Sequence, residues 1–244
     1  MKRKSFTIAA AALVSLAATT VFSDPFETLL ERGDLPPDAR KTVMNFLPRA
    51  VLIRNIPAEK FSTTDAIMEY LFEHPVLTAT IVRGMGLGDF RVLEKGAGSF
   101  HVTEGKSIEA ECRQIYHRRG LHLYSITGQY YGSLFIHLAG EALLLARYRP
   151  LGDELVEVKA DAALMVDNRF YGFLVTIFGP LFKRLVDKRF SYYMHIARRL
   201  AEALAKDPGG VYNRLLENGA LNSQEQKEFQ SFFPQKPSVR GSRY

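Results

Sequence analysis

The chain of 244 residues contains no tryptophan and a single cysteine, Cys112. One cysteine excludes an intrachain disulfide framework and any cysteine-rich metal site. We expect Cys112 to be a small apolar residue inside a strand. No low-complexity tract is present, and the 47% hydrophobic and 24% charged residues are typical of a globular protein with a sizeable core.

Motifs of the common hydrolase and nucleotide-binding sites are missing as well. The histidines include no His-x-x-x-His pair, and the chain has no Gly-x-Ser-x-Gly or Ser-x-x-Lys motif. The stretch GMGLG, residues 84–88, ends a predicted helix and does not follow a strand, which favours a helix terminator over a phosphate loop. We therefore expect no metal ion and no cofactor, and we assign no catalytic residue.

Residues 1–23 have the pattern of a signal peptide. Lys2, Arg3 and Lys4 precede an uncharged apolar stretch, which predicts export, with the bacterial periplasm as the expected location. The alternative is a membrane tether by an uncleaved N-terminal segment, because the apolar run is at the short end of what spans a bilayer. The formal net charge of +6 falls to +3 once those three basic residues are removed, so nucleic acid is not an expected partner.

The remainder divides into an N-terminal helical extension (24–49), a domain (50–207) and a C-terminal tail with short helices (208–244). The domain begins with a strand over 51–56, followed by a helix capped by Ser62 or Thr63 and a second short helix that ends in the glycines. In the tail, Asn222 or Ser223 is a candidate helix cap.

From residue 89 to residue 166 the apolar residues alternate with a period of two. The turn residues divide this region into six predicted antiparallel strands, at 89–95, 98–105, 108–118, 120–127, 133–150 and 154–167. In the last strand Val158 and Ala160 face one way, whereas Glu157, Lys159 and Asp161 face the other. We therefore expect a sheet with one dry and one wet face.

The segment from Gly179 to Pro208 has helical periodicity and could cover the dry face. Its apolar residues recur every three or four positions, which predicts one long amphipathic helix. The predicted stripe consists of Phe182, Val186, Phe190, Tyr193, Ala197, Leu200 and Leu204.

This element order resembles that of the START-like superfamily, which includes polyketide cyclase-like (SRPBCC) and Bet v 1 type proteins. The resemblance covers about residues 50–207, and the segment GPLFKRLVDKRFSYYMHIARRLAEAL looks like the C-terminal helix of bacterial polyketide-cyclase-like members. It implies an α+β helix-grip fold, with a curved antiparallel sheet of about six or seven strands wrapped on that helix. It also implies that an apolar ligand lies between the sheet and the helix. The superfamily has no invariant catalytic signature, so no residue role is carried over.

The strand alternation places small residues on the inward face, which leaves room for a ligand unless aromatic side chains of the helix fill the space. The inward small residues are Ala110, Cys112, Ala146, Ala160 and Ala162. The predicted ligand-binding residues are Cys112, Tyr116, Tyr124, His137, Tyr148, Val158, Ala160, Phe190, Tyr193 and Ala197.

The resemblance and these residues favour an exported protein that binds or transfers a hydrophobic small molecule, which the resemblance implies is a lipid. A non-catalytic role is favoured over an enzymatic one. One alternative is a cyclase or aromatase in the same cavity, with an acid or base among His122, His137, Tyr124 and Glu141. Another is a non-catalytic periplasmic interaction protein. Transient contact with a membrane surface is expected through Phe170, Tyr171, Phe173, Lys188 and Arg189, although solvated basic residues are the simpler interpretation.

Overall fold

The structure is a computed structural model that describes residues 25–131, 137–166 and 179–233. Eight antiparallel strands form one sheet in the order β1-β8-β7-β6-β5-β4-β3, and β2 also pairs with β8. Pro57 lies between β1 and β2, so the edge beside β8 is divided into two short strands. The strands are β1 (Leu52–Asn55), β2 (Glu59–Phe61), β3 (Phe90–Gly96), β4 (Ser99–Glu104), β5 (Ile108–Arg118), β6 (Leu121–Tyr131), β7 (His137–Gly152) and β8 (Leu155–Val166).

The strands from β3 to β8 form a meander of neighbouring antiparallel pairs. The turn between β5 and β6 is tight, because Arg118 pairs with Leu121, and its Gly120 has a φ of 78°. A side chain at Gly120 would be strained in that conformation, and its Cβ would lie 2.8 Å from the carbonyl oxygen of Tyr148. The period-two prediction is confirmed for residues 89–131 and 137–166, whereas residues 132–136 lie outside the described residues.

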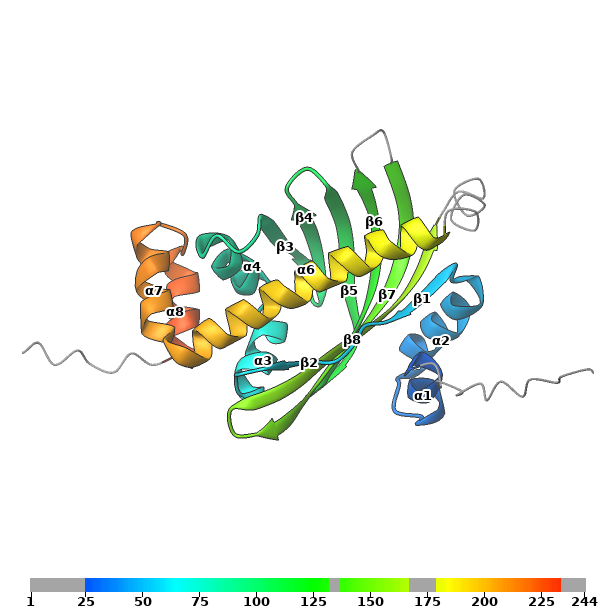
Figure 1. Cartoon of the computed structure of the whole chain (residues 1–244), viewed down its shortest axis with the longest axis horizontal. Coiled ribbons are helices and arrows are strands. Elements are labelled where there is room, and N and C mark those ends of the chain that lie inside the picture. Colours follow the sequence, from blue (N-terminus) through cyan, green and yellow to red (C-terminus); the bar gives the residue numbers. More distant parts are fainter. Residues whose placement is uncertain (1–24, 132–136, 167–178, 234–244) are drawn as a thin grey trace, which may run out of the picture.

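The long helix α6 (Gly179–Lys206) crosses one face of the sheet from end to end (Figure 1). From Val186 onward its stripe faces the sheet as predicted, with Val186, Leu200 and Leu204 buried, whereas the side chain of Phe182 lies outside the described residues. Two short helices, α3 (Asp65–Glu73) and α4 (Pro75–Gly84), lie beside α6 on the same face, and the N-cap of α3 is Thr64, not Ser62 or Thr63. A meandering antiparallel sheet gripping one long C-terminal helix is the helix-grip fold, so the fold-class prediction is confirmed.

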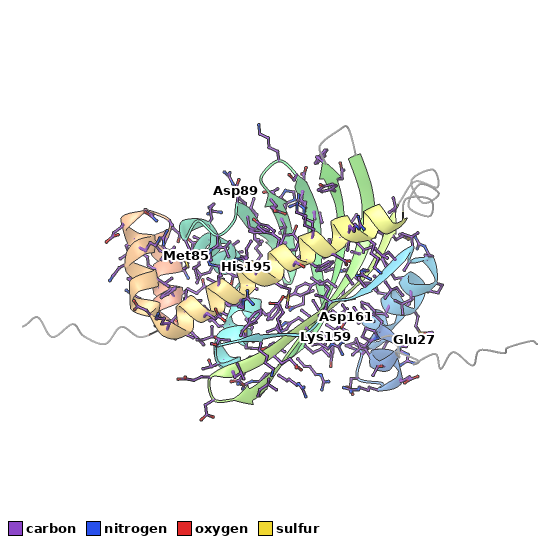
Figure 2. The ribbon with its side chains drawn as sticks, in the orientation of Figure 1. Glu27, Met85, Asp89, Lys159, Asp161 and His195 are labelled. Carbon is purple, nitrogen blue, oxygen red and sulfur yellow. The ribbon has the colours of Figure 1, made fainter. Side chains whose placement is uncertain are left out.

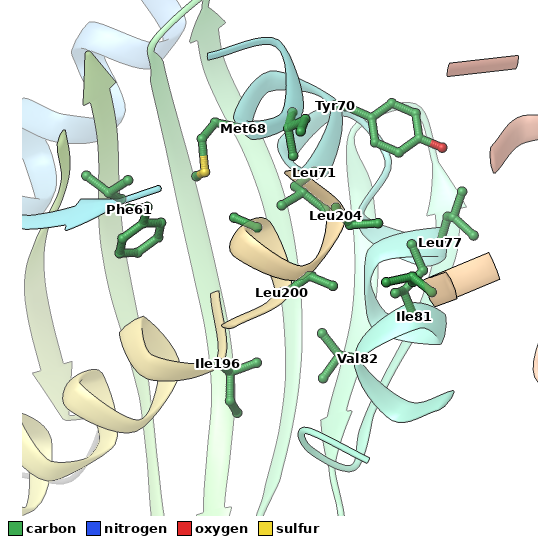
Figure 3. Close-up of a cluster of buried hydrophobic side chains, with 14 of the residues drawn as sticks. Phe61, Met68, Tyr70, Leu71, Leu77, Ile81, Val82, Ile196, Leu200 and Leu204 are labelled. Carbon is green, nitrogen blue, oxygen red and sulfur yellow. The ribbon is translucent and has the colours of Figure 1, made fainter. Parts of the chain in front are cut away.

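One apolar core lies between α3, α4, one half of α6 and the sheet. Figure 3 shows Met68 and Leu71 of α3 meeting Leu200 and Leu204 of α6, with Ile81 of α4 nearby. None of the helices in the described part of the chain is both long and apolar enough to cross a membrane.

The C-terminal helices α7 (Pro208–Glu217) and α8 (Ser223–Phe232) pack into this same core. Phe229 is fully buried, and Phe232 stacks on Tyr70 of α3 with ring centroids 4.2 Å apart. Asn222 caps α8 in a reciprocal capping box with Glu225, as one of the two expected caps. The segment beyond residue 207 therefore contributes core residues to the domain.

The opposite face of the sheet carries a second core under the N-terminal helices. Three N-terminal helices cover it: α1 (Pro25–Glu31), α2 (Pro37–Phe46) and the short 3-10 helix η1 (Leu47–Arg49). They pack on the side chains that β6, β7 and β8 direct away from α6, including Leu123, Leu143, Leu145 and Ala163. The prediction that this face is wet was wrong, because the N-terminal extension shields part of it from water.

Asp161 shows the consequence of that second layer. Its side chain is fully buried and pairs with Arg147 of the neighbouring strand β7. Lys159 lies on the same strand as Asp161 (Figure 2), with its Nζ 3.9 Å from the carboxylate. The alternation of β8 is as predicted, but one of its polar residues belongs to a buried ion pair.

Candidate functional site

Two apolar cavities lie between the sheet and α6. The larger, of about 420 Å³, is bounded by residues of β3 to β8 and by Val186, Phe190 and Tyr193 of α6. The smaller, of about 330 Å³, is bounded by α3, α4, part of the sheet and Ala197 of α6. Phe90 and Tyr193 line both cavities. Both volumes fall in the range of small-molecule sites, roughly 300 to 1,000 Å³.

Small residues of the sheet form part of the wall of the larger cavity. Its walls include Ala110, Cys112, Gly128 and Ala142. At Gly128 an added Cβ would lie 2.7 Å from the Cβ of Ala110, so the two strands approach closely there. The prediction that small inward residues leave room is confirmed for Ala110 and Cys112. The other predicted small residues, Ala146, Ala160 and Ala162, are buried without lining either cavity.

The predicted ligand-binding residues lie in several different places. Cys112, Phe190 and Tyr193 line the larger cavity, and Tyr124, Tyr193 and Ala197 line the smaller one. Val158, Ala160 and Tyr148 belong to the packed core instead. His137 begins β7, where it pairs with Tyr131 of β6. Sequence alternation thus identified the correct face but not which part of that face is hollow.

Tyr116 lies on the wrong face of the sheet for its predicted role. Between Gln114 and Tyr116 the register of β5 against β6 shifts by one residue, so Gln114 pairs with Tyr124 but Tyr116 pairs with Leu123. A β-bulge of this kind transfers the following side chain to the other face. Tyr116 therefore packs against the second core, under the N-terminal helices.

The predicted membrane-contact residues also separate. Phe170, Tyr171 and Phe173 lie outside the described residues. Lys188 is exposed, as expected for a surface contact. Arg189, in contrast, lines the larger cavity and forms an ion pair with Glu104, with 3.0 Å between Nη1 and Oε1. Its side chain is 30% exposed, and its contact with a membrane stays a prediction.

Glu104 organises a polar group at the wall of the larger cavity. The Tyr193 hydroxyl donates to its Oε2 over 2.6 Å, while Arg189 also lies over the ring of Tyr130, 5.4 Å from its centroid. Burial and the bond to Glu104 raise the pKa of Tyr193, so the phenol stays protonated and donates. Glu104 was not among the predicted site residues, although it is the one acidic residue at the inward register of β4, opposite Phe90 and Ile108.

A second polar group lies behind the smaller cavity and centres on His122, which is fully buried. The Gln114 side chain lies 3.2 Å from its Nδ1 and 3.4 Å from the Tyr124 hydroxyl. On the other side, His122 Nε2 is 3.6 Å from Oε2 of Glu69, which also accepts a hydrogen bond from Tyr148. His122 was a candidate acid or base of the cyclase alternative, and the register of β6 turns its ring into the interior.

Phe72 separates His122 from the smaller cavity. The two rings stack with centroids 4.3 Å apart, and Phe72 lines the cavity whereas His122 does not. Burial, and then the neighbouring His117, lower the pKa of His122 to about 4, although Glu73 opposes the shift. The ring is therefore neutral near pH 7.

Cys112 is a shielded thiol in the wall of the larger cavity. Burial, and then the charge of Glu111, raise its pKa to about 11, which makes it a poor nucleophile. Among residues 25–131, 137–166 and 179–233, no group of three or more His, Cys, Asp or Glu side chains is arranged to bind a metal ion.

No protein-family model and no curated protein matches the chain. Solved structures do. A conserved protein from Geobacillus kaustophilus aligns with a TM-score of 0.44 at 12% identity, over 62% of this chain and 97% of that one. Norcoclaurine synthase from Thalictrum flavum aligns with a TM-score of 0.41 at 13% identity, over 64% of this chain and 95% of that one. An aromatase/cyclase from a Streptomyces species aligns with a TM-score of 0.42 at 14% identity, over 65% of this chain and 99% of that one.

The fold assignment itself rests on the strand order and the position of α6. The neighbours include enzymes by name, and their activities are theirs alone at this level of identity.

Proposed function

We propose that this protein binds a hydrophobic small molecule between the sheet and α6, and that the natural ligand is a lipid chain. The observation that carries the proposal is the pair of adjoining cavities with almost entirely apolar walls. A core that merely filled space would be expected to close such volumes, because protein interiors are packed without voids of this size.

The chemistry of the walls suits the apolar part of a ligand. Three charged residues line the larger cavity, Glu104, Glu141 and Arg189, and two of them, Glu104 and Arg189, are engaged with each other and with Tyr193. Each buried methylene group contributes about 0.8 kcal/mol, so an alkyl chain can be held by apolar contacts without a charged partner.

We also propose that the protein is exported and carries its ligand between membranes. Residues 1–23 support export through their signal-peptide pattern. Lys183, Arg184 and Lys188 support transient contact with an anionic membrane, because they are exposed on the first turns of α6, the same turns whose Val186 and Phe190 line the larger cavity.

Ligand binding can be tested with N-phenylnaphthylamine, a neutral dye that brightens in apolar surroundings. The wild-type chain should bind it saturably at one to two sites per molecule. Ala142→Phe places a large ring in the larger cavity and should weaken binding at least tenfold, whereas Ala66→Phe adds the same ring to an exposed position of α3 and should not. No saturable binding by the wild type would reject the proposal.

Transfer can be tested by following a fluorescent phospholipid from donor to acceptor vesicles that contain anionic lipid. Lys188→Glu should slow transfer and raise the salt sensitivity of what remains, because it reverses an exposed charge beside the cavity. Lys227→Glu reverses an exposed charge on α8 and serves as the control. Equal transfer by both variants would contradict the membrane-contact proposal while leaving ligand binding intact.

Export can be tested by N-terminal sequencing of the protein purified from the cell envelope. A mature chain that begins at Asp24 supports the proposal, and an intact N-terminus in the membrane fraction supports the tethered alternative. A chain that remains intact in the cytoplasmic fraction contradicts both.

A further inference from the structure

We propose that Tyr193 and Phe90 form a partition between the two cavities and thereby set the length of the apolar chain that the protein accepts. This inference rests on the proposed ligand binding. The partition would make Tyr193 and Phe90 determinants of specificity. Displacement by alcohols of different length distinguishes a failure of the partition from a failure of binding.

The two residues occupy the boundary between the cavities. Both line the larger and the smaller cavity, and they come from opposite walls, Phe90 from the start of β3 and Tyr193 from the middle of α6. Their rings meet edge to face with centroids 5.8 Å apart. A chain that extended from one cavity into the other would have to pass this contact.

Tyr193 is held in place from its far end. Its hydroxyl donates to Glu104 over 2.6 Å, and Glu104 is only 9% exposed. Arg189, one turn earlier on α6, binds the other oxygen of the same carboxylate over 3.0 Å. Because hydrogen bonds to a charged group are strong in apolar surroundings, the ring cannot turn aside without leaving a buried carboxylate partly unpaired.

Phe90 is fixed from its backbone and from its outer side. Its carbonyl oxygen accepts a hydrogen bond from Arg83 Nη1 over 2.9 Å, and the ring of Tyr192 lies 6.4 Å away. The partition is thus anchored on both sides, by an ion pair at α6 and by α4 at the sheet.

The partition has a consequence for ligand size. Each cavity alone lies in the lower half of the usual volume range of small-molecule sites, whereas the two joined would lie in the upper half. With the partition in place, a straight chain should gain affinity with length only until it fills one cavity. Each methylene group before that limit should tighten binding about fourfold.

The experiment is displacement of N-phenylnaphthylamine by straight-chain alcohols from octanol to hexadecanol. These alcohols are neutral and differ only in length. For the wild type, affinity should rise with chain length and then level off. Tyr193→Ala should move the levelling point to longer chains, so that the longest alcohols bind at least tenfold tighter than to the wild type. Phe90→Ala should do the same from the opposite wall.

Two further variants separate the ring from its anchor. Tyr193→Phe keeps the ring but loses the bond to Glu104, and we expect a levelling point between those of the wild type and Tyr193→Ala. Tyr131→Ala removes an exposed tyrosine at the end of β6 and should leave the profile unchanged. Circular dichroism melting curves verify that each variant is folded, and either alanine variant alone suffices if the other is unstable.

The possible results differ in what they overturn. A wild type that binds neither the dye nor any alcohol rejects ligand binding itself. A wild type that binds with a levelling point that neither alanine variant moves overturns the partition and leaves binding intact. A wild type whose affinity rises over the whole series also overturns the partition, because the chain then passes between the rings unaided.

Discussion

Acidification should destabilise the protein through His122. The ring is fully buried, and its pKa is lowered from 6.5 to about 4, first by burial and then by His117. As the pH falls below about 6.5, the unfolded chain takes up a proton that the native chain refuses until about pH 4. Since the unfolded state then binds more protons, the free energy of unfolding falls across this window and levels off below it.

The loss should amount to about 3 kcal/mol between pH 7 and pH 4, because each pKa unit corresponds to about 1.4 kcal/mol. Urea unfolding followed by circular dichroism at several pH values measures it. His122→Gln removes the titrating ring, and its stability should fall by about 3 kcal/mol less than that of the wild type over the same window. His195→Gln alters an exposed histidine of α6 and should retain the full slope.

The carboxylates of the chain also titrate in this window, so the difference between the wild type and His122→Gln is the informative quantity. Parallel curves for these two proteins would refute the reasoning. They would mean that His122 is hydrated and charged in the native state, and that the Phe72 ring does not shield it from the smaller cavity. An acid or base would then be available at the cavity wall, as the cyclase-type alternative requires.

Three further predictions concern reactivity and stability. Cys112 should react with a maleimide about 100-fold more slowly than the thiol of the urea-unfolded chain, because its pKa is raised from 9.0 to about 11; equal rates would show that the thiol is open to solvent. Arg147→Met should lower the free energy of unfolding by roughly 3 kcal/mol, because it removes the nearer of the two basic partners of the buried Asp161, whereas Arg149→Met breaks an exposed ion pair and should change urea stability little; similar effects would contradict the burial of Asp161. Phe229→Ala should cost about 3 to 5 kcal/mol in the same assay, because α8 belongs to the main core, and a negligible effect would mean that α8 is a detachable tail.

The periodicity of the sequence was sufficient for the architecture. Alternation over residues 89–166 predicted the six meander strands to within a few residues, with glycine at the turns. The three- and four-residue spacing after Gly179 predicted α6 and the face that it turns toward the sheet. These patterns are local consequences of burying one side of an element, so a single sequence shows them.

Features that depend on contacts between distant segments were not predictable in the same way. The bulge after Gln114 places one extra residue of β5 opposite β6, and the pattern of residue types in β5 does not reveal it. The bulge moves the Tyr116 side chain to the other face of the sheet. The covering of the second face depends on where α1 and α2 dock, which no spacing within β8 reveals, and so Asp161 was expected in water.

The candidate site was predicted in outline for the same reason. The inward register identified Cys112, Tyr124, Phe190 and Tyr193 as residues of the cavity walls. The position of the cavity depends on which of the inward side chains pack against α6, and strand alternation does not reveal that packing. The pairing of Glu104 with Arg189 joins residues 85 positions apart, and adjacent basic residues in α6 gave no indication of which one turns inward.

The most direct test of ligand binding is native mass spectrometry of the protein purified from its own cell envelope in a mild, removable detergent. The proposal predicts a fraction of molecules that carry one apolar ligand, which lipid extraction then releases and identifies. It also predicts that Ala142→Phe loses this mass while Ala66→Phe keeps it. A wild type that shows only its bare mass, and that takes up nothing from added lipid extract, would contradict the central claim that the space beneath α6 is a binding site.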